Sequence, residues 1–424
     1  MGHRAALLVM ALIGMTACGA QPTARPSLDG TVVDADPPRF SDPTRISNPL
    51  FPVSELAQVI QLGVDGGQPL RVEVTLMPET RTISWRGEQI ETVVAQFIAY
   101  RERRVVEVAY DFFAQADDGS VWYFGETVDN YGGGQVTNHS GAWLAGVDGP
   151  PGMIMPASPE VGDIYHPENI PGVVFEELIV LETGITVDGP SGPITGVIKV
   201  EEHLMDGGVE QKLWAPGYGE YRTETVGELL TAAVASPADA VPGGVPDPIL
   251  GIRRAAVVLA DAAATGDATP EAWLQTIRTG WDAHRDEAPM LLAQEMDAAL
   301  AELDRAAAAG DRLVLRQAAI DVLQVALDLE LRYRAPSSID LHRLSAWMRQ
   351  LALDVDATDR PAVLGDVAIA SVIWARAGHA LDGDSTREIE ARLASAAAAA
   401  GEGDMPQARR AAEGLMTVLD SHSG

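Results

Sequence analysis

Histidine is the residue type of this chain with the widest chemical use, yet its positions form no recognisable catalytic or metal-binding pattern. Away from the two ends the histidines are His139, His166, His203, His284, His342 and His379. Asp282 and His284 are two residues apart in a stretch of helical period, as are Asp340 and His342, and a helix places such positions on different faces. Di-iron carboxylate sites instead use Glu-x-x-His. We therefore expect no metal site.

One strand-like segment brings a histidine, an acid and a lysine onto a common face. Lys199, Glu201 and His203 alternate with apolar or acidic neighbours, and a strand places alternate residues on one side. Such a row lines a cavity, binds a cation or forms ion pairs on a solvent-facing surface. We favour the solvent-facing interpretation, because opposite charges on one face of a sheet commonly pair.

Arrangements for nucleophilic or acid–base catalysis are also missing from the sequence. Ser191 lies in Gly189-Pro190-Ser191-Gly192-Pro193, which differs from the Gly-x-Ser-x-Gly of a nucleophile elbow and is typical of a turn. The neighbouring acids Glu176-Glu177 and Glu201-Glu202 point to opposite faces of their strands and cannot act together on one bond. We expect no catalytic residue and no cofactor.

The only cysteine, Cys18, lies in Met15-Thr16-Ala17-Cys18, directly after the apolar run 5–15 that follows Arg4. A positive charge, a short apolar run and small residues are the parts of a secretory signal. The order resembles the lipobox of bacterial lipoproteins, with Met15 in the place that leucine usually takes. This resemblance implies that residues 1–17 are a signal peptide and that Cys18 becomes a diacylglyceryl cysteine carrying acyl chains such as palmitate.

The lipobox resemblance has two consequences. Two acyl chains are enough for stable attachment to a membrane, so we expect an extracytoplasmic protein, lipid-anchored to the bacterial cell membrane or outer membrane. Once Cys18 is acylated, no thiol remains for a disulfide, a thiolate–zinc site or a cysteine nucleophile.

Charge and composition narrow the partners and divide the chain. The formal net charge of −31 repels nucleic acid, so we expect no nucleic-acid partner. Lys199 and Lys212 are the only lysines, which we interpret as a composition habit and not as a site. Residues 18–50 are rich in proline and predict a lipidated tether, and residues 233–248 contain four prolines and predict a linker between two domains.

Between these breaks, residues 51–232 show the period of strands. Apolar residues alternate with polar ones over 70–76 and 106–112, and 121–124 is a run of valine and aromatic residues. Asp117-Asp118-Gly119 and Asp206-Gly207-Gly208 are hairpin-turn signals. The pattern predicts an antiparallel β meander that curls into a sandwich or a partly open barrel.

Residues 249–421 change to the helical period and predict an all-α domain. Helix-stop glycine and helix-start aspartate occur together at Gly310-Asp311 and Gly403-Asp404, and similar junctions occur at Asp267 and Thr358-Asp359. These junctions predict four αα-hairpins, packed as an irregular bundle or as a solenoid, of which we favour the bundle. The predicted fold class is therefore α+β and multidomain.

A series of motifs runs through residues 90 to 225. These are Val121-Trp122-Tyr123-Phe124-Gly125-Glu126, Pro151-Gly152-Met153-Ile154-Met155-Pro156-Ala157 and Ala215-Pro216-Gly217-Tyr218-Gly219. Their order resembles that of a group of uncharacterised secreted bacterial lipoproteins. The resemblance implies an all-β fold for this part and assigns no activity and no catalytic residue. Aromatic runs and Pro-Gly turns are also what the core and corners of a sheet require.

Three functions follow as hypotheses. We favour a non-enzymatic interaction or binding module on a lipid anchor, with a protein partner or a ligand. The alternative is a carrier of an apolar ligand, because a curved sheet can enclose one, and a deep apolar cavity on the concave side would favour it. A metal-dependent enzyme is the third, and it predicts His139, His166 and His203 gathered with acids in one cleft.

Overall fold

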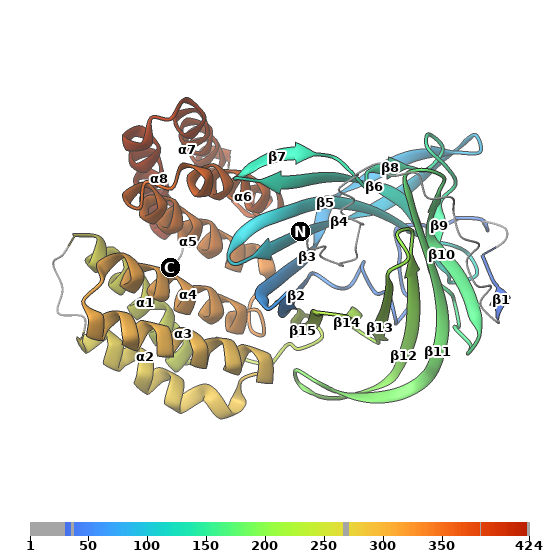
Figure 1. Ribbon diagram of the computed structural model, residues 1–424, viewed down its shortest axis with the longest axis horizontal. Helices are drawn as coiled ribbons and strands as arrows, with labels where there is room; N and C mark the ends of the chain where they lie inside the picture. The colour runs from blue at the N-terminus through green and yellow to red at the C-terminus, as the bar shows by residue number, and fades with distance from the viewer. Residues whose placement is uncertain (1–29, 35–37, 266–270, 382, 422–424) are drawn as a thin grey trace. The chain divides into compact units, whose positions relative to one another are not determined.

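Strands fill the first half of the described chain and helices the second, which confirms the predicted α+β class (Figure 1). The computed structural model describes residues 30–34, 38–265, 271–381 and 383–421. It divides into a β unit, Met1–Tyr131 with Val136–Ala232, and a helical unit, Ala233–Gly424 with Gly132–Gln135. Cys18 and the predicted signal peptide lie outside the described residues.

One continuous sheet forms the β unit. Its strands are β1 Thr31–Val32, β2 Gln58–Asp65, β3 Gln68–Trp85, β4 Glu88–Arg101, β5 Arg104–Gln115, β6 Val121–Gly132, β7 Gln135–Asn138, β8 Trp143–Leu144, β9 Gly152–Met155, β10 Asp163–Ile170, β11 Val174–Gly189, β12 Gly192–Leu204, β13 Val209–Ala215, β14 Gly219–Thr225 and β15 Glu228–Ser236. They follow the order β1-β10-β11-β12-β13-β14-β15-β2-β3-β4-β5-β6-β7, with β8 and β9 also paired to β6. Strand β1 pairs with β10 in parallel, whereas the pairs from β10 to β15 and from β2 to β6 are antiparallel. The predicted meander is thus present, with β15 joined to β2 where the order departs from sequence.

The sheet curls, as the long curved strands of Figure 1 show, so that β9 links β6 and β10, the strands next to its two ends. Strand β9 pairs with β6 on one side and lies against β10 on the other. The backbones are so close there that a Cβ atom added to Gly152 would lie 1.9 Å from the carbonyl oxygen of Pro167. A glycine is therefore required at this contact. Of the two predicted forms, the structure has the partly open barrel.

The packed part of the chain begins earlier than the predicted boundary at residue 51. Thr31 and Val32 pair with β10, and Ile46 and Leu50 are buried against the sheet. The side-chain amide of Asn48 donates hydrogen bonds to two carbonyl oxygens of the sheet loops, at 3.0 and 3.1 Å. The prediction of a tether through residue 50 therefore differs from the structure, because apolar side chains within the proline-rich segment pack on the barrel.

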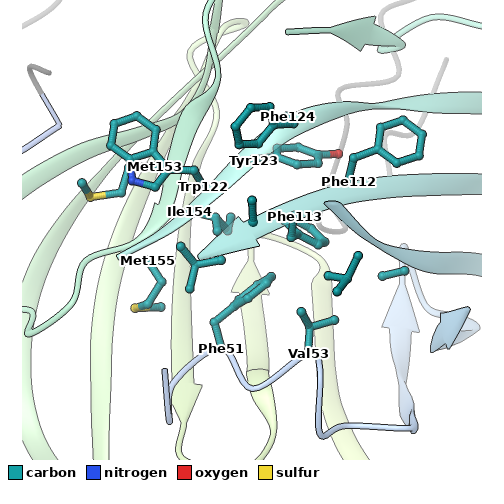
Figure 2. Packing of buried hydrophobic residues seen from close by; sticks show 14 of the residues in the cluster. Phe51, Val53, Phe112, Phe113, Trp122, Tyr123, Phe124, Met153, Ile154 and Met155 are labelled. Carbon is teal, nitrogen blue, oxygen red and sulfur yellow. The ribbon is translucent and has the colours of Figure 1, made fainter. Parts of the chain in front are cut away.

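Aromatic rings fill the concave side of the sheet (Figure 2). The rings of Phe51 and Phe113 pack edge to face with their centroids 4.8 Å apart, and Phe113 stacks on Tyr123 at the same distance. Tyr123 in turn packs edge to face on Trp143 at 5.5 Å. Such ring pairs add to the hydrophobic gain from burial, by about 0.5–1.5 kcal/mol each.

Helices of the helical unit form the four predicted hairpins within the described residues. They are α1 Asp247–Thr265, α2 Glu271–His284, α3 Met290–Ala309, α4 Arg312–Glu330, α5 Pro336–Asp356, α6 Arg360–Ala377, α7 Gly383–Glu402 and α8 Met405–Ser421, with short 3₁₀ turns at 285–287 and 378–380. Gly310 has a left-handed backbone and ends α3, as predicted. The Asp311 side chain accepts hydrogen bonds from two backbone N–H groups of α4 and caps the start of that helix, as predicted. The Asp267 junction lies outside the described residues.

The hairpins pack around α4 and α5, whose sides are buried almost all round. Helix α1 lies against α2, α4 and α5, while α5 lies against α4, α6 and α8. Contacts of one helix with three others favour the bundle over a simple linear stack. The predicted linker at 233–248 is shorter than expected, because β15 continues to Ser236 and α1 begins at Asp247. Among the helices that the structure describes, none is long and apolar enough to span a bilayer.

Candidate functional site

Acidic side chains line the concave side of the barrel among its aromatic rings. We call them the acidic row: Glu107, Asp111, Glu126, Glu168, Glu176, Glu202, Glu210 and Glu220, all of them buried. Strand register places them on one side. Asp111 is the partner of Ala95 on β4 and of Glu126 on β6, so all three side chains lie on the same face.

The first part of the row lies on β5 and β6. The Tyr123 hydroxyl donates a hydrogen bond of 2.9 Å to Oδ1 of Asp111. Burial raises the pKa of Asp111 to about 7, although this hydrogen bond acts to lower it. Burial, together with the charge of Asp111, raises the pKa of Glu107 to about 8. Burial and then the charge of Glu168 raise the pKa of Glu126 well above its ordinary value.

The second part lies on β10 to β12, across the closure of the barrel. The Trp143 indole donates a hydrogen bond to Oε1 of Glu168, and Glu168 is the cross-strand partner of Glu176. Burial raises the pKa of Glu168 to about 8, against the lowering effect of the Trp143 hydrogen bond. Burial also raises the pKa of Glu176 well above its ordinary value. Two like charges side by side in an apolar interior favour a bound proton on one of them.

Lys212 is the single lysine within this interior. Its Nζ atom lies 2.6 Å from Oε2 of Glu202 and 3.4 Å from Oε2 of Glu220. Burial lowers its pKa, but Glu202, Glu220 and Glu210 outweigh burial and raise the pKa well above the ordinary lysine value. These carboxyl groups therefore favour the charged form of Lys212. The scarcity of lysine gave no sign of this role, in which Lys212 neutralises part of the acidic row.

A pocket of about 60 Å³ opens on the concave side, between the sheet and the segment 51–56. Its wall is mainly apolar and aromatic, with Phe51, Phe97, Phe113, Trp214 and Tyr218 as its rings. Asp111, Glu220 and Gln61 are its polar members. Gln61 is held in place because its side-chain amide donates a 2.8 Å hydrogen bond to the carbonyl oxygen of Glu220.

One of the sequence motifs builds part of this wall, and a second orients one of its acids. Ala215–Gly219 forms the turn from β13 to β14, which holds Trp214, Tyr218 and Glu220 around one side of the pocket. Left-handed backbone at Gly217 and Gly219 makes the turn tight. The motif at 121–126 contributes Tyr123, which orients Asp111 from the other side. Both motifs therefore serve the pocket as well as the core.

A buried carboxyl group with a pKa near neutrality has two chemical uses. When protonated it donates a hydrogen bond to an oxygen of a ligand, and when ionised it holds a cation. The surrounding rings exclude water and strengthen either interaction. The pocket is thus suited to bind a small polar or positively charged group beside an apolar surface.

Sequence-predicted candidates lie on the outer side of the same strands. Glu201 and His203 are half-buried and form an ion pair of 2.9 Å, whereas Glu202 between them faces inward. This confirms that Glu201 and His203 lie on the solvent-facing side of β12, as predicted. Gly189 pairs with Gly192 in the turn between β11 and β12, which confirms the turn around Ser191.

His166 and His139 also have acidic partners but lie apart. His166 contacts Asp34 at 2.9 Å and Glu177 at 3.1 Å. Burial lowers the pKa of His166, but these two acids outweigh burial and raise it overall. His139 contacts Asp129 at 2.9 Å in an exposed position beside β7. Within residues 30–34, 38–265, 271–381 and 383–421, no group of three or more His, Cys, Asp or Glu side chains is arranged to hold a metal ion.

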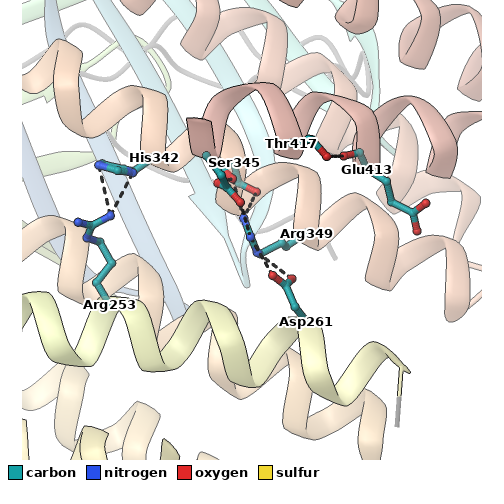
Figure 3. A network of polar contacts seen from close by, with 8 residues as sticks. Arg253, Asp261, His342, Ser345, Arg349, Glu413 and Thr417 are labelled. Atoms are coloured by element: carbon teal, nitrogen blue, oxygen red, sulfur yellow. Dashed lines mark hydrogen bonds and ion pairs between the residues drawn. The ribbon is translucent and has the colours of Figure 1, made fainter. Parts of the chain in front are cut away.

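His342 of the helical unit belongs to a packed polar contact (Figure 3). Arg253 Nη1 lies 3.2 Å from Nδ1 of His342, and burial followed by the charge of Arg253 lowers the pKa of His342 to about 4. Asp340 instead pairs with Arg376 at 2.8 Å, so the two neighbours do point apart as predicted. Burial lowers the pKa of His284. His379 lies exposed in the 3₁₀ turn after α6.

A neighbouring contact ties three helices of this unit together. Arg349 on α5 donates to Asp261 of α1 at 3.0 and 2.9 Å and to Asp420 of α8 at 2.9 Å (Figure 3 shows the Asp261 contact). Bidentate arginine–carboxylate contacts are directional and fix the orientation of the helices that carry them. We interpret these helical polar groups as structural.

Sequence reasoning missed the acidic row because it treated acids in alternating strands as the solvent-facing side. Both sides of β5 are buried. Glu107 and Asp111 face the interior of the barrel, and Val108 faces the other side. A signal was present: aspartate and glutamate are depleted from strands, and here they recur at inward positions of strand after strand.

Together, the fold and the site define a two-unit α+β protein whose antiparallel barrel has a buried acidic interior. No protein-family model matches the chain, and no curated protein matches its sequence.

Proposed function

We propose that this chain is a lipid-anchored extracytoplasmic lipoprotein that acts as a non-enzymatic binding module, and that its β unit binds a small ligand. The observation that carries the proposal is the pocket on the concave side, with an aromatic wall and the carboxyl groups of Asp111 and Glu220. Few polar groups placed on an apolar concave surface are typical of small-molecule sites.

The size of the pocket favours a small ligand over a lipid. Sites for drug-sized molecules usually enclose about 300–1,000 Å³. The volume here is about 60 Å³, several times the about 10–15 Å³ that a cavity needs on the same measure to hold one water molecule. The carrier hypothesis is thereby modified: the interior is suited to a compact molecule with polar groups and not to an acyl chain.

Lipid anchoring rests on the Met15–Cys18 sequence, and the resemblance of the 90–225 motifs to secreted lipoproteins supports the same location. An anchored module with a small-molecule pocket would hold its ligand at the membrane surface. The strongly acidic charge of the chain supports a position away from anionic headgroups.

The test uses the soluble chain from Gly19 to Gly424, purified from an exporting host. Val74 borders the pocket, so Val74→Phe fills it, while Val64→Phe places the same ring at an exposed site on the neighbouring strand β2 as the control. Native mass spectrometry should show a bound small molecule, or binding from a library of small polar compounds, in the wild type and Val64→Phe. Val74→Phe should lose it while keeping its circular dichroism spectrum. Equal binding by both variants would contradict a site in the pocket.

A further inference from the structure

We infer that the pocket takes a small aliphatic ammonium ion that also carries a hydroxyl oxygen. The inference rests on the proposed function, since it names the ligand class of the same pocket. It follows from three properties of the wall: its excess of acids, its aromatic rings and an indole N–H that has no acceptor.

The acids of the wall call for positive charge. Asp111 and Glu220 both line the pocket, and the buried base Lys212 is already paired, at 2.6 Å with Glu202 and 3.4 Å with Glu220. Asp111 accepts a hydrogen bond from the Tyr123 hydroxyl and shares one with Glu126, and neither partner brings a positive charge. An ammonium group donates three hydrogen bonds and would supply the missing cation beside Asp111.

The rings of the wall favour an organic cation over a metal ion. Phe51, Phe113 and Trp214 border the same space, and aromatic faces attract a cation within about 6 Å. Calcium and magnesium instead need about six or more oxygen ligands, and a wall made mainly of carbon does not offer them. The described residues contain no metal-holding group of acids and histidines, in agreement with this choice.

The hydroxyl oxygen is assigned from Trp214. Its indole lines the pocket, the residue is 1% exposed, and Nε1 has no hydrogen-bond acceptor among the residues that the structure describes. Buried indole N–H groups usually find an acceptor. A ligand oxygen that reaches this N–H group would accept the hydrogen bond.

Four probes of equal size separate these contributions. Ethanolamine carries both groups, propylamine lacks the oxygen, 1-propanol lacks the charge, and ethylene glycol has two oxygens and no charge. Binding is measured at pH 8 and constant ionic strength by ¹⁹F NMR of protein labelled with 5-fluorotryptophan, with the Trp214 signal assigned from Trp214→Phe. Sodium chloride serves as the control for screening.

We expect ethanolamine to shift the Trp214 signal with at least tenfold higher affinity than 1-propanol or ethylene glycol, and propylamine to bind more weakly than ethanolamine. Asp111→Asn should reduce ethanolamine affinity at least tenfold and leave 1-propanol unchanged. Glu201→Gln, on the outer face of β12, should change neither.

Three results would overturn the inference. If 1-propanol binds as well as the amines, the pocket binds small molecules but not by charge, and the proposed function stands without this ligand class. If sodium chloride produces the same shift, the effect is not specific to an ammonium ion. If none of the probes binds and Val74→Phe also matches the wild type in native mass spectrometry, both the ligand class and the proposed function are wrong.

Discussion

Single residues of the barrel interior show why its acids are tolerated there. A carboxylate in an apolar interior must be paired with a cation or take up a proton. Glu202 shows the first solution, because it is paired with the cation Lys212. Glu107 shows the second, because its raised pKa favours the protonated form. These two solutions make different predictions for mutation and for pH.

Replacing Lys212 tests the first solution. Lys212→Met leaves Glu202 and Glu220 without their cation, and removing one member of a buried pair typically costs about 3–5 kcal/mol. We expect a loss of that size in the free energy of unfolding of the β unit at pH 8, measured by urea denaturation with the ¹⁹F signals of its tryptophans.

Lys199→Met is the matched control for that variant. Lys199 is the only other lysine and lies half-buried on the outer face of the adjacent strand β12, so its replacement should cost less than about 0.5 kcal/mol. The double variant Glu202→Gln with Lys212→Met should recover part of the loss. Equal losses for Lys199→Met and Lys212→Met would show that Lys212 does not neutralise the row.

Raised carboxyl pKa values predict how stability changes with pH. In the folded chain the pKa of Asp111 is about 7, and those of Glu107, Glu168 and Glu210 are about 8, with burial as the first cause of each rise. Between pH 4.5 and 8 the folded state therefore holds protons that the unfolded state has lost. Stability from these groups is complete below about pH 4.5 and is lost as pH rises towards 8.

We thus expect the β unit to have a higher melting temperature at pH 5 than at pH 8.5, followed by ¹⁹F NMR of Trp122, Trp143 and Trp214. His166, whose pKa is also raised, acts in the same direction. Glu107→Gln cannot ionise and should reduce the difference between the two pH values. A melting temperature that rises from pH 5 to 8.5 would mean that the interior acids are ionised in the folded state.

Strands and helices differ in how far their sequences predict them. The period of residues 70–76 and 106–112 predicted strands, and the Gly-Asp junctions predicted the hairpins, because local geometry determines both signals. The closure of the sheet at β9 was not predictable, because Gly152 meets Pro167 only after the sheet has curled. The pocket was missed for a similar reason, since its wall joins β2, β5 and β13 from distant parts of the sequence.

Barrel closure is tested at the element that forms it. A side chain at Gly152 would collide with the backbone of β10, so Gly152→Ala should destabilise the β unit by about 1–3 kcal/mol, in the range of overpacking. Gly244→Ala, where an added Cβ meets nothing within 4 Å, is the control and should change stability by less than about 0.5 kcal/mol. Urea denaturation of both variants decides this, and unchanged stability in Gly152→Ala would show that β9 and β10 separate readily.

At the scale of the whole molecule, we predict attachment to the membrane through Cys18. In a bacterial host the full chain should fractionate with membranes and incorporate a clickable palmitate analogue, since two acyl chains anchor stably. Cys18→Ala should remove the label and release the chain from membranes, while Thr16→Ser, which keeps a small residue before the cysteine, should not. Membrane recovery of Cys18→Ala equal to that of the wild type would contradict a lipid anchor.

The most direct test of the account measures protons released when the pocket binds an ammonium ion. Asp111 is faced by Tyr123 and Glu126 of β6, Glu107 of its own strand β5 and Glu168 of β10, and none of these side chains carries a positive charge. With the pKa of Asp111 near 7, a bound cation must displace its proton. An aliphatic amine itself stays protonated throughout, because its pKa is close to 10.

Calorimetric titration of ethanolamine in two buffers of different ionisation enthalpy gives the number of protons released per ligand. We predict a release approaching one at pH 6, an affinity about tenfold higher at pH 8 than at pH 6, and neither effect in Asp111→Asn. Binding that releases no proton, or that weakens as pH rises from 6 to 8, would contradict a cation site in the acidic interior of the barrel.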